Sequence, residues 1–379
     1  MYIVTKGNWG GAQRYVYDLA CEATARGFLP VVASGENGLL TRRLKELGIA
    51  TKQLPSLARD VSIFKDFRSF FEIFRLVQKI RPAVIHVNSS KAGGIGALAA
   101  RLASSACIVF TVHGLPQNED RSWLPKKIIV LLTWLTALLS HRVIAITNGD
   151  AEQLRRQPFL RKKIHYIPNG IAYVGKDRDR ARALIVSHIS DTNAQEKLAG
   201  GIWIGTVAEL TRNKGHQYAL EALVTLSNRY PNIVYVVVGD GELSPEYKLF
   251  VEEHDLQNHV FFTGFIPDAA ELYSAFDIYL ASSIKEGLPY TIIEAMSSGV
   301  PIVASRVGGI PDVIMHGISG HLIVIHSSDA IVEALTHILE NKAYRAALGE
   351  NARREALKTY TKSAMAEKTF RLYDNCTHL

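Results

Sequence analysis

Apolar residues along the first half of the chain alternate between short continuous runs and longer stretches with helical spacing. The continuous runs have the length and composition of buried strands and lie at residues 1–5, 29–33, 83–87, 108–112 and 142–146. Stretches whose apolar residues recur three or four positions apart predict helices at 10–26, 39–47, 63–79 and 93–102. The aromatic residues of 63–79 are expected to be core. We predict a parallel sheet with helices on both faces.

The second half repeats this alternation. Its strand-like runs lie at residues 203–207, 233–238, 260–262, 278–281 and 302–305. Its helical stretches lie at 216–228, 269–276, 291–298, 329–340 and 343–374. Two doubly wound, Rossmann-like α/β domains are therefore predicted to follow one another, and we expect a ligand site in the cleft that they face.

A domain boundary is predicted within residues 168–200. Pro168-Asn169-Gly170 is a turn signal, and residues 176–182 form a run of alternating charge. We assign residues 1–172 to an N-terminal acceptor-side domain and 173–355 to a C-terminal donor-side domain. Residues 356–379 are predicted to form a helix that packs back toward the N-terminal domain. The first predicted strand is short, which is consistent with a strand that lacks its outer part.

Composition is that of an ordinary globular protein, with 47% apolar and 21% charged residues. No uncharged apolar run approaches the roughly 18 residues of a membrane-spanning helix, and the first residues lack the apolar stretch of a signal peptide. Cys21, Cys107 and Cys376 are odd in number and far apart. They indicate neither a disulfide framework nor a zinc site, and they fit a reducing cytoplasm.

Charge is unevenly distributed between the halves. Residues 1–172 hold 24 Lys and Arg against 11 Asp and Glu, a net charge of +13, whereas residues 173–379 carry 19 against 25, or −6. A basic half favours an anionic partner, and we find no nucleic-acid recognition motif. Lys126 and Lys127 precede an apolar segment with Trp134, which suits a helix at an anionic membrane surface. The alternative is a helix buried within its own domain, which its length favours.

Two carboxylates, Glu286 and Glu294, flank the start of a predicted helix. Pro289 suits the first helical position, where the missing N–H costs nothing. If the helix begins there, both acids can lie on its pocket side. The free N–H groups of a first helical turn attract anions such as phosphate. This segment therefore favours a nucleotide-sugar, although two glutamates near a helix start are also common without any ligand.

Asp177 and Asp179 form an Asp-x-Asp pair, a pattern found in metal-dependent glycosyl transfer. The pair lies in the charged linker and does not follow a predicted strand. A solvated charge run is therefore the favoured interpretation, and no metal or other cofactor is expected.

The chain resembles the retaining glycosyltransferases of family 4, which have the two-domain GT-B architecture. The resemblance covers nearly the whole chain. It is carried by Gly10-Gly11-Ala12-Gln13-Arg14, residues 86–93, Thr111-Val112-His113-Gly114, Ile167-Pro168-Asn169-Gly170, Asn213-Lys214-Gly215, residues 239–242 and the block from Glu286 to Glu294. It implies metal-free transfer of a sugar from a nucleoside diphosphate to an acceptor hydroxyl.

The resemblance also implies roles in the second half. Glu294 would accept hydrogen bonds from ribose, and Glu286 would contact the transferred sugar. Backbone N–H groups would hold phosphate at Gly287, Leu288 and Tyr290. Lys214 would reach the pyrophosphate, although a surface ion pair with an acid is the alternative. The family has an arginine five residues before this lysine, where this chain has Glu209. Arg212 could supply the second cation, and Glu209 could contact a hydroxyl or only cap local structure.

In the first half, Gly10 and Gly11 would let a loop approach the donor. His113 would stabilise an oxocarbenium-like state or orient a hydroxyl, with a structural hydrogen bond as the rival interpretation. Arg14 and Lys91 are weaker acceptor-side candidates, and a solvated lysine is the simpler interpretation for Lys91. His86 is interpreted as a strand-end residue with a satisfied ring.

The expected mechanism is front-face substitution, in which the leaving phosphate oxygen takes the acceptor proton. The sugar and nucleotide stay open among UDP-linked and GDP-linked donors, and the acceptor is expected in polysaccharide or glycolipid assembly. The expected location is the cytoplasm, including the inner face of the plasma membrane. A nucleotide-sugar 2-epimerase and a non-catalytic sugar-nucleotide-binding protein remain alternatives. A dehydrogenase is disfavoured because no Gly-x-Gly-x-x-Gly follows the first strand.

Overall fold

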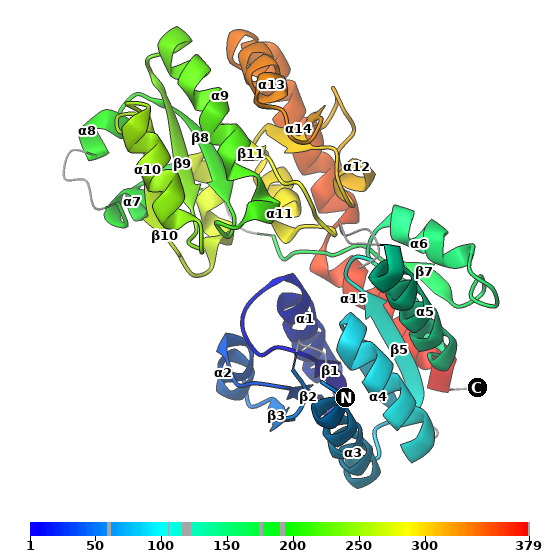
Figure 1. Cartoon of the computed structure of the whole chain (residues 1–379). Coiled ribbons are helices and arrows are strands. Elements are labelled where there is room, and N and C mark those ends of the chain that lie inside the picture. Colours follow the sequence, from blue (N-terminus) through cyan, green and yellow to red (C-terminus); the bar gives the residue numbers. More distant parts are fainter. Residues whose placement is uncertain (59–61, 105, 116–122, 174–176, 190–193, 378–379) are drawn as a thin grey trace. The chain divides into compact units, whose positions relative to one another are not determined.

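The computed structural model describes residues 1–58, 62–104, 106–115, 123–173, 177–189 and 194–377. The chain divides into two compact units (Figure 1). The N-terminal unit comprises Met1–Asn169 together with Lys362–Leu379, and the C-terminal unit comprises Gly170–Thr361. In the predicted linker, residues 174–176 and 190–193 lie outside the described residues.

The N-terminal unit is built on a seven-stranded parallel sheet in the order β3-β2-β1-β4-β5-β6-β7. The strands are β1 (Tyr2–Val4), β2 (Val31–Ser34), β3 (Ala50–Gln53), β4 (Val84–Asn88), β5 (Cys107–Val112), β6 (Arg142–Ala145) and β7 (Ile164–Tyr166). The five predicted strands are confirmed, and the sequence pattern missed the two edge strands, β3 and β7. An edge strand is buried less completely, and three of the four residues of β3 are exposed, so neither gives a continuous apolar run.

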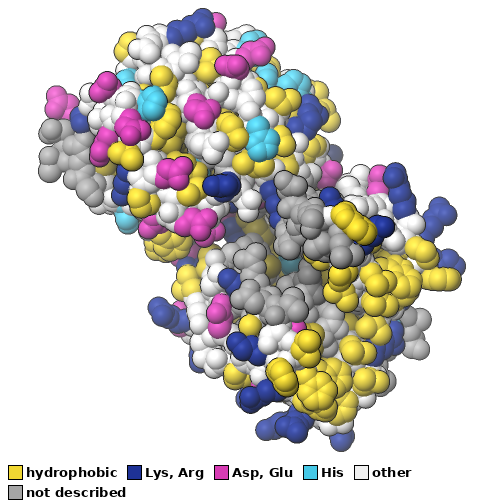
Figure 2. All heavy atoms as spheres, viewed as in Figure 1, with side chains coloured by type: hydrophobic (Ala, Val, Ile, Leu, Met, Phe, Trp, Pro, Cys, Tyr) yellow, Lys and Arg dark blue, Asp and Glu magenta, His cyan; other side chains and the backbone are white. Residues whose placement is uncertain are grey.

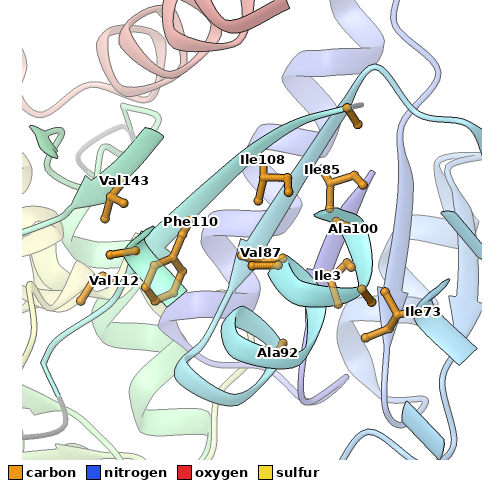
Figure 3. Packing of buried hydrophobic residues seen from close by; sticks show 14 of the residues in the cluster. Ile3, Ile73, Ile85, Val87, Ala92, Ala100, Ile108, Phe110, Val112 and Val143 are labelled. Carbon is orange, nitrogen blue, oxygen red and sulfur yellow. The ribbon is translucent and has the colours of Figure 1, made fainter. Parts of the chain in front are cut away.

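Helices cover both faces of this sheet. They are α1 (Gly11–Ala25), α2 (Leu39–Glu46), α3 (Ile63–Ile80), α4 (Ser90–Ala103), α5 (Trp123–Leu139), α6 (Asn148–Arg155) and α15 (Lys362–Thr377). Figure 3 shows part of the core of this unit, in which Ile73 of α3 lies near Ile3 of β1, and Ala100 of α4 lies near Ile85 of β4. A Cβ added to Gly93 would lie 2.9 Å from the Phe110 ring, so α4 approaches the sheet more closely than a larger residue would allow.

The C-terminal unit has a six-stranded parallel sheet in the order β10-β9-β8-β11-β12-β13. Its strands are β8 (Ile202–Val207), β9 (Ile233–Val238), β10 (Val260–Gly264), β11 (Ile278–Ala281), β12 (Ile302–Ser305) and β13 (His321–Ile323). Two helices, α7 (Arg178–Ser187) and α8 (Ala194–Leu198), precede the first of these strands. The strands are joined or followed by η2 (Arg212–Lys214), α9 (His216–Arg229), α10 (Ser244–Glu253), η3 (Ala269–Ala275), α11 (Tyr290–Ser298), α12 (Ile310–Val313), α13 (Ser328–Glu340) and α14 (Lys342–Thr359). Two Rossmann-like units are therefore present, as predicted.

The helical stretch predicted at 343–374 is two helices. It breaks at Tyr360, where the backbone carbonyl accepts a hydrogen bond from Ile171 N at 3.0 Å, and the isolated bridge between Ile171 and Thr361 follows. α14 belongs to the C-terminal unit and α15 to the N-terminal unit, where α15 contacts α1 and β5.

The interpretation of the cysteines was wrong. Cys107, the first residue of β5, and Cys376, in the last turn of α15, form a disulfide. The two residues are 269 positions apart, and only the docking of α15 on β5 brings them together, so their spacing carried no signal. The cysteine pattern therefore gives no support for a reducing compartment.

Two expectations about buried helices were also wrong. On α3, Phe70 and Phe74 pack against the core, but Phe64, Phe67 and Phe71 are exposed. Among the described side chains of α5, the exposed large apolar residues are Trp123, Ile128, Leu131, Leu132 and Leu135. The helical spacing correctly predicted helices, but each helix is apolar around more of its circumference than the sheet can cover. No helix among the described residues is long and apolar enough to cross a membrane.

Candidate active site

The loops at the carboxyl ends of the C-terminal strands bring Lys214 and Glu286 together. The Lys214 ammonium donates a hydrogen bond to Glu286 Oε1 at 2.6 Å, and Ser283 Oγ donates to the same oxygen at 2.7 Å. Lys214 ends η2, and Gly215 then adopts a left-handed conformation with φ 61° before α9 begins at His216. The lysine thus meets the acid that the sequence analysis assigned to the sugar.

Backbone contacts hold these two loops in register. Ile284 N donates to Asn213 O at 2.8 Å, and Ser282 Oγ donates to Lys214 O at 3.2 Å. A Cβ at Gly215 would lie 2.3 Å from Ser282 O, so only glycine permits this approach. The position of the Lys214 ammonium beside Glu286 is therefore fixed by the fold of both loops.

A third loop, after β12, closes on the backbone of Glu286. Gly308 has φ 58°, and a Cβ there would lie 2.2 Å from Glu286 O. Gly309 N donates to Gly287 O at 2.7 Å. These contacts orient the Glu286–Gly287 segment immediately before α11. This third loop could not be predicted from the sequence, because Gly308 and Gly309 are more than 20 residues from Glu286 and meet it only in the folded chain.

The prediction that Pro289 is the first helical residue was wrong. Pro289 is the N-cap with an extended ψ of 131°, and α11 begins at Tyr290. Glu286 therefore lies in the preceding loop, whereas Glu294 lies inside the helix and is buried. The N-cap residue Pro289 makes no side-chain hydrogen bond to the first turn of α11. Gly287 is half-buried, and Leu288 and Tyr290 are buried.

Tyr279 of β11 lies close enough to both Glu286 and Glu294 for their charges to act on its phenol. Burial raises the pKa of the Tyr279 phenol above its ordinary value, and the carboxylates of Glu286 and Glu294 both raise that pKa further. Both carboxylates thus act on one buried ring from the loop and the helix. The sequence analysis missed Tyr279 and Ser283, since only the folded strand end shows that they neighbour the acids.

Glu209 and Arg212 are exposed residues of the loop after β8. His216 Nε2 donates to the backbone carbonyl of Glu209 at 3.3 Å, and burial lowers the pKa of His216 to about 4. The structure therefore shows Glu209 supporting the loop through its backbone. The predicted contacts of both side chains with a donor stay predictions.

In the N-terminal unit, His113 follows the end of β5. Its Nε2 lies 3.3 Å from Asn88 Oδ1, and its ring packs edge-on against Tyr15 at 5.0 Å between centroids. Asn88 Nδ2 donates to His86 O, so Oδ1 is the atom that faces His113 and Nε2 is the protonated nitrogen. Burial lowers the pKa of His113 to about 4, which makes the ring neutral at pH 7 with Nδ1 as a hydrogen-bond acceptor.

His86 has a satisfied ring, as interpreted, although it lies in the middle of β4. Its Nε2 bonds Thr111 Oγ1 at 2.6 Å and its Nδ1 bonds the Tyr373 hydroxyl of α15 at 2.5 Å. Burial lowers the pKa of His86 well below its ordinary value. This histidine therefore fastens α15 to the sheet as a neutral ring.

The other N-terminal candidates lie near the starts of α1 and α4. Gly10 is the N-cap of α1, Gly11 is its first residue, and no side chain caps that helix. Arg14 lies 3.9 Å from Asp18 one turn later. The Lys91 ammonium pairs with Asp66 Oδ1 at 2.6 Å, which joins α4 to α3, so the simple interpretation as a solvated lysine was wrong. Roles toward a substrate stay predictions for all four.

One group of potential metal ligands occurs among the described residues, formed by Cys107, His141 and Cys376. His141 Nδ1 accepts a hydrogen bond from Ile108 N at 2.9 Å, which leaves the proton of the neutral ring on Nε2. Neither ring nitrogen then has a free lone pair, and both sulfurs are engaged in the disulfide. This donor set does not suit a metal ion.

The C-terminal unit also contains a cavity of about 460 Å³ at the opposite, amino end of its sheet. Arg178, Asp277, Pro301, Lys342 and Arg345 contribute to its lining. Asp277 directly precedes β11 and Pro301 directly precedes β12, whereas Lys214 and Glu286 follow strand ends. The cavity is therefore separate from the loops that hold the candidate site.

Two family models match the two halves of the chain. Residues 9–173 match the model of Glycosyltransferase Family 4, and residues 190–355 match that of Glycosyl transferases group 1. The chain belongs to the family 4 glycosyltransferases. One relative of this glycosyltransferase is an Escherichia coli enzyme, UDP-Gal:α-D-GlcNAc-diphosphoundecaprenol α-1,3-galactosyltransferase. The two sequences are 28% identical over 89% of this chain and 87% of the Escherichia coli chain. The putative glycosyltransferase EpsD of Bacillus subtilis is 26% identical, covering 83% and 81%.

Among solved structures, Anabaena HepE in complex with UDP-glucose is 21% identical to this glycosyltransferase. It covers 99% of this chain and 98% of its own, with a TM-score of 0.82. This similarity shows that the fold is GT-B.

Proposed function

We propose that this glycosyltransferase moves a sugar from a UDP-sugar to a lipid-linked sugar acceptor, with retention of anomeric configuration and without a metal ion. The observation that carries the proposal is the Lys214–Glu286 ion pair, which lies in the loops that lead into the start of α11. It combines a cation, a carboxylate and backbone N–H donors within one set of loops. Diphosphate, sugar hydroxyls and phosphate oxygens are the matching groups of a nucleotide-sugar.

The pair suggests an exchange of partners when the donor binds. The diphosphate would take the Lys214 ammonium, and the Glu286 carboxylate, still held by Ser283, would turn its acceptor capacity to the sugar hydroxyls. Glu294 is buried within α11, in the helix that follows the Glu286 loop, and would bind the ribose hydroxyls. This assignment makes Glu286 a binding group and leaves it no role as a nucleophile.

In the transfer step, the bond from the anomeric carbon to the β-phosphate oxygen breaks, and a bond from that carbon to the acceptor oxygen forms on the same face. The acceptor proton passes to the departing phosphate oxygen. Lys214 and the first N–H groups of α11 stabilise the negative charge that develops on the diphosphate, which is the task that a metal ion performs in other enzymes. His113, neutral with Nδ1 available, would orient a sugar hydroxyl.

The choice of UDP draws support from the Anabaena HepE complexes with UDP and UDP-glucose and from the UDP-Gal of the Escherichia coli relative's name. The diphosphoundecaprenol in that name supports a lipid-linked acceptor. We accordingly place the enzyme at the cytoplasmic face of a membrane, where the lipid-linked acceptor and the nucleotide-sugar meet.

The test incubates the purified enzyme with a panel of UDP- and GDP-sugars and a short-chain lipid diphosphate acceptor carrying GlcNAc. We expect one UDP-sugar to give product in the presence of EDTA, with the anomeric configuration of the donor by NMR. An inverted product would contradict retention, and activity abolished by EDTA and restored by a divalent cation would contradict the metal-free proposal. A UDP-sugar converted to its 2-epimer without acceptor would replace the transferase with an epimerase.

A further inference from the structure

Three helices of the N-terminal unit expose an unusual amount of apolar surface. α4 packs between α3 and α5, and we call these three helices the basic–apolar layer. On α3 the exposed apolar residues are Ile63, Phe64, Phe67 and Phe71, and on α4 they are Leu98 and Leu102. α5 adds Trp123 and four aliphatic residues between 128 and 135. Figure 2 shows hydrophobic side chains gathered over α3 and α5, with Lys and Arg beside them.

Every exposed charged side chain that the structure describes in this layer is basic. On α3 these are Lys65, Arg68, Arg75 and Lys79. On α4 and α5 they are Arg101, Lys126 and Lys127.

The layer contains two acids in its sequence, Asp66 and Glu72, and both are engaged by other groups. Asp66 pairs with Lys91 at 2.6 Å, and Glu72 accepts a hydrogen bond from Ser56 Oγ at 2.7 Å. The outer surface thus combines apolar and positive groups without an exposed acid among its described side chains.

Other helices of the same unit do not share this character. The large exposed hydrophobic residues of the described chain include none on α1 or α15. The exposed side chains of α15 include Glu367, Lys368, Arg371 and Asp374, a balanced set of charges. Among the described helices of this unit, exposed large hydrophobic residues are therefore concentrated on the basic–apolar layer; elsewhere in the unit they lie between helices and strands, at Phe28, Leu29, Leu47 and Phe159.

The loop before β7 continues the same chemistry next to α5. Trp134 Nε1 of α5 donates to Pro158 O at 3.0 Å, which holds the loop against the helix. Phe159 is 85% exposed, and the nearby Arg161 and Lys162 are exposed as well. An aromatic side chain between cations thus occurs again on a different segment.

We propose that the basic–apolar layer docks on the surface of a bilayer that contains anionic lipid. Phe, Leu and Trp side chains enter the boundary between head groups and acyl chains, while Lys and Arg meet lipid phosphates. A protein partner would need a matching apolar face lined with acids, and the exposed side chains of this chain's own α15 do not offer one. The reason for docking, access to a lipid-linked acceptor, rests on the proposed function, whereas the docking surface itself is inferred from the exposed apolar and basic side chains.

The experiment measures flotation of the full chain with vesicles of phosphatidylcholine alone or with about one third phosphatidylglycerol, at physiological salt. We expect the wild-type chain to float with the anionic vesicles and to partition at least about tenfold less to the neutral ones. Phe64→Ser with Phe67→Ser should reduce partitioning by at least about tenfold, because both side chains are exposed and lose their insertion energy. Lys126→Glu with Lys127→Glu should reduce it by at least about 25-fold, or fivefold for each cation.

Matched controls come from α10 of the C-terminal unit, where Lys248 and the 53% exposed Leu249 are adjacent. Lys248→Glu and Leu249→Ser should leave partitioning unchanged. Wild-type chain that does not float, or layer variants that float as the wild type does, would overturn the inference. A stable dimer that the Phe variants dissociate, without vesicle binding, would assign the layer to a second copy of the chain and overturn it as well.

Transfer to a water-soluble acceptor separates this inference from the proposed function. The layer variants should keep the wild-type rate with such an acceptor and lose rate only with acceptor embedded in vesicles. A wild-type chain that binds vesicles but transfers no sugar would contradict the proposed function and leave the docking surface standing.

Discussion

The two units differ in the charge of the polar side chains discussed above: an ion pair in the C-terminal unit, and neutral histidines in the N-terminal unit. In the C-terminal unit, Lys214 and Glu286 form a partly exposed ion pair held by loop backbone. In the N-terminal unit, His86 and His113 are neutral rings whose pKa values are lowered by burial. The comparison predicts that Lys214 and Glu286 would meet a ligand with charge, whereas His113 would meet it as a neutral ring. The corresponding variants should differ in kind as well as in size.

The largest effect is expected for Lys214→Met, which removes the cation of the Lys214–Glu286 pair. Loss of a cation at a developing diphosphate should lower kcat/KM by about 10²–10³-fold. Lys214→Arg should retain part of the rate because it keeps the charge. Lys248→Met, on the exposed surface of α10, is the control and should keep the wild-type kcat/KM. A Lys214→Met enzyme with wild-type kinetics would remove the charged site from the mechanism.

Glu294→Gln should have the next largest effect and should act on binding. A charge-assisted hydrogen bond is worth about 1.5–3 kcal/mol, so donor Kd should rise by about 10- to 100-fold in calorimetric titration with UDP. The substitution preserves side-chain volume within the buried turn of α11. Glu253→Gln, at an exposed position at the end of α10, serves as the matched control. Unchanged UDP affinity would show that Glu294 is structural.

His113→Ala should lower turnover by about 10- to 100-fold and leave donor affinity nearly unchanged, since a neutral imidazole contributes orientation without charge. His113→Asn retains an acceptor and should recover part of the rate. A change in donor Kd with constant kcat would instead place His113 in the donor-binding group, and the contrast between the units would fail.

The smallest effect concerns pH. The pKa of His113 is about 4 in the folded chain and about 6.5 when unfolded, so the unfolded chain binds more protons below pH 6.5. Its contribution to stability is complete above pH 6.5 and is lost as the pH falls toward 4. We expect Tm to fall between pH 7 and pH 5, and to fall less in His113→Asn. Equal slopes of Tm against pH would show that the ring titrates normally.

The sequence predicted the central strands and much of the helical framework. β5 and β9 are fully buried and appear as continuous apolar runs, which made them recognisable. β3, β7 and β13 are short strands with polar or partly exposed residues, so apolar pattern alone did not reveal them. The spacing of aromatic residues located α3 but could not say how much of its surface the sheet covers.

The sequence motifs indicated Lys214 and Glu286 as candidates, and the structure brings these two side chains into contact, but the other contacts around them could not be predicted. The motifs named Lys214, Glu286 and His113, but their neighbours Ser283, Tyr279 and Asn88 are brought beside them by the meeting of strand ends. The wrong position for Pro289 has a local cause, because proline is acceptable both as a first helical residue and as an N-cap with extended ψ.

The disulfide between Cys107 and Cys376 has a topological consequence. The two cysteines are 269 positions apart in the sequence, and Gly170–Thr361 lies entirely between them. The whole C-terminal unit is therefore part of the covalent ring that the disulfide closes. A single proteolytic cut anywhere in that unit would leave both fragments attached to one another until a reductant opened the ring.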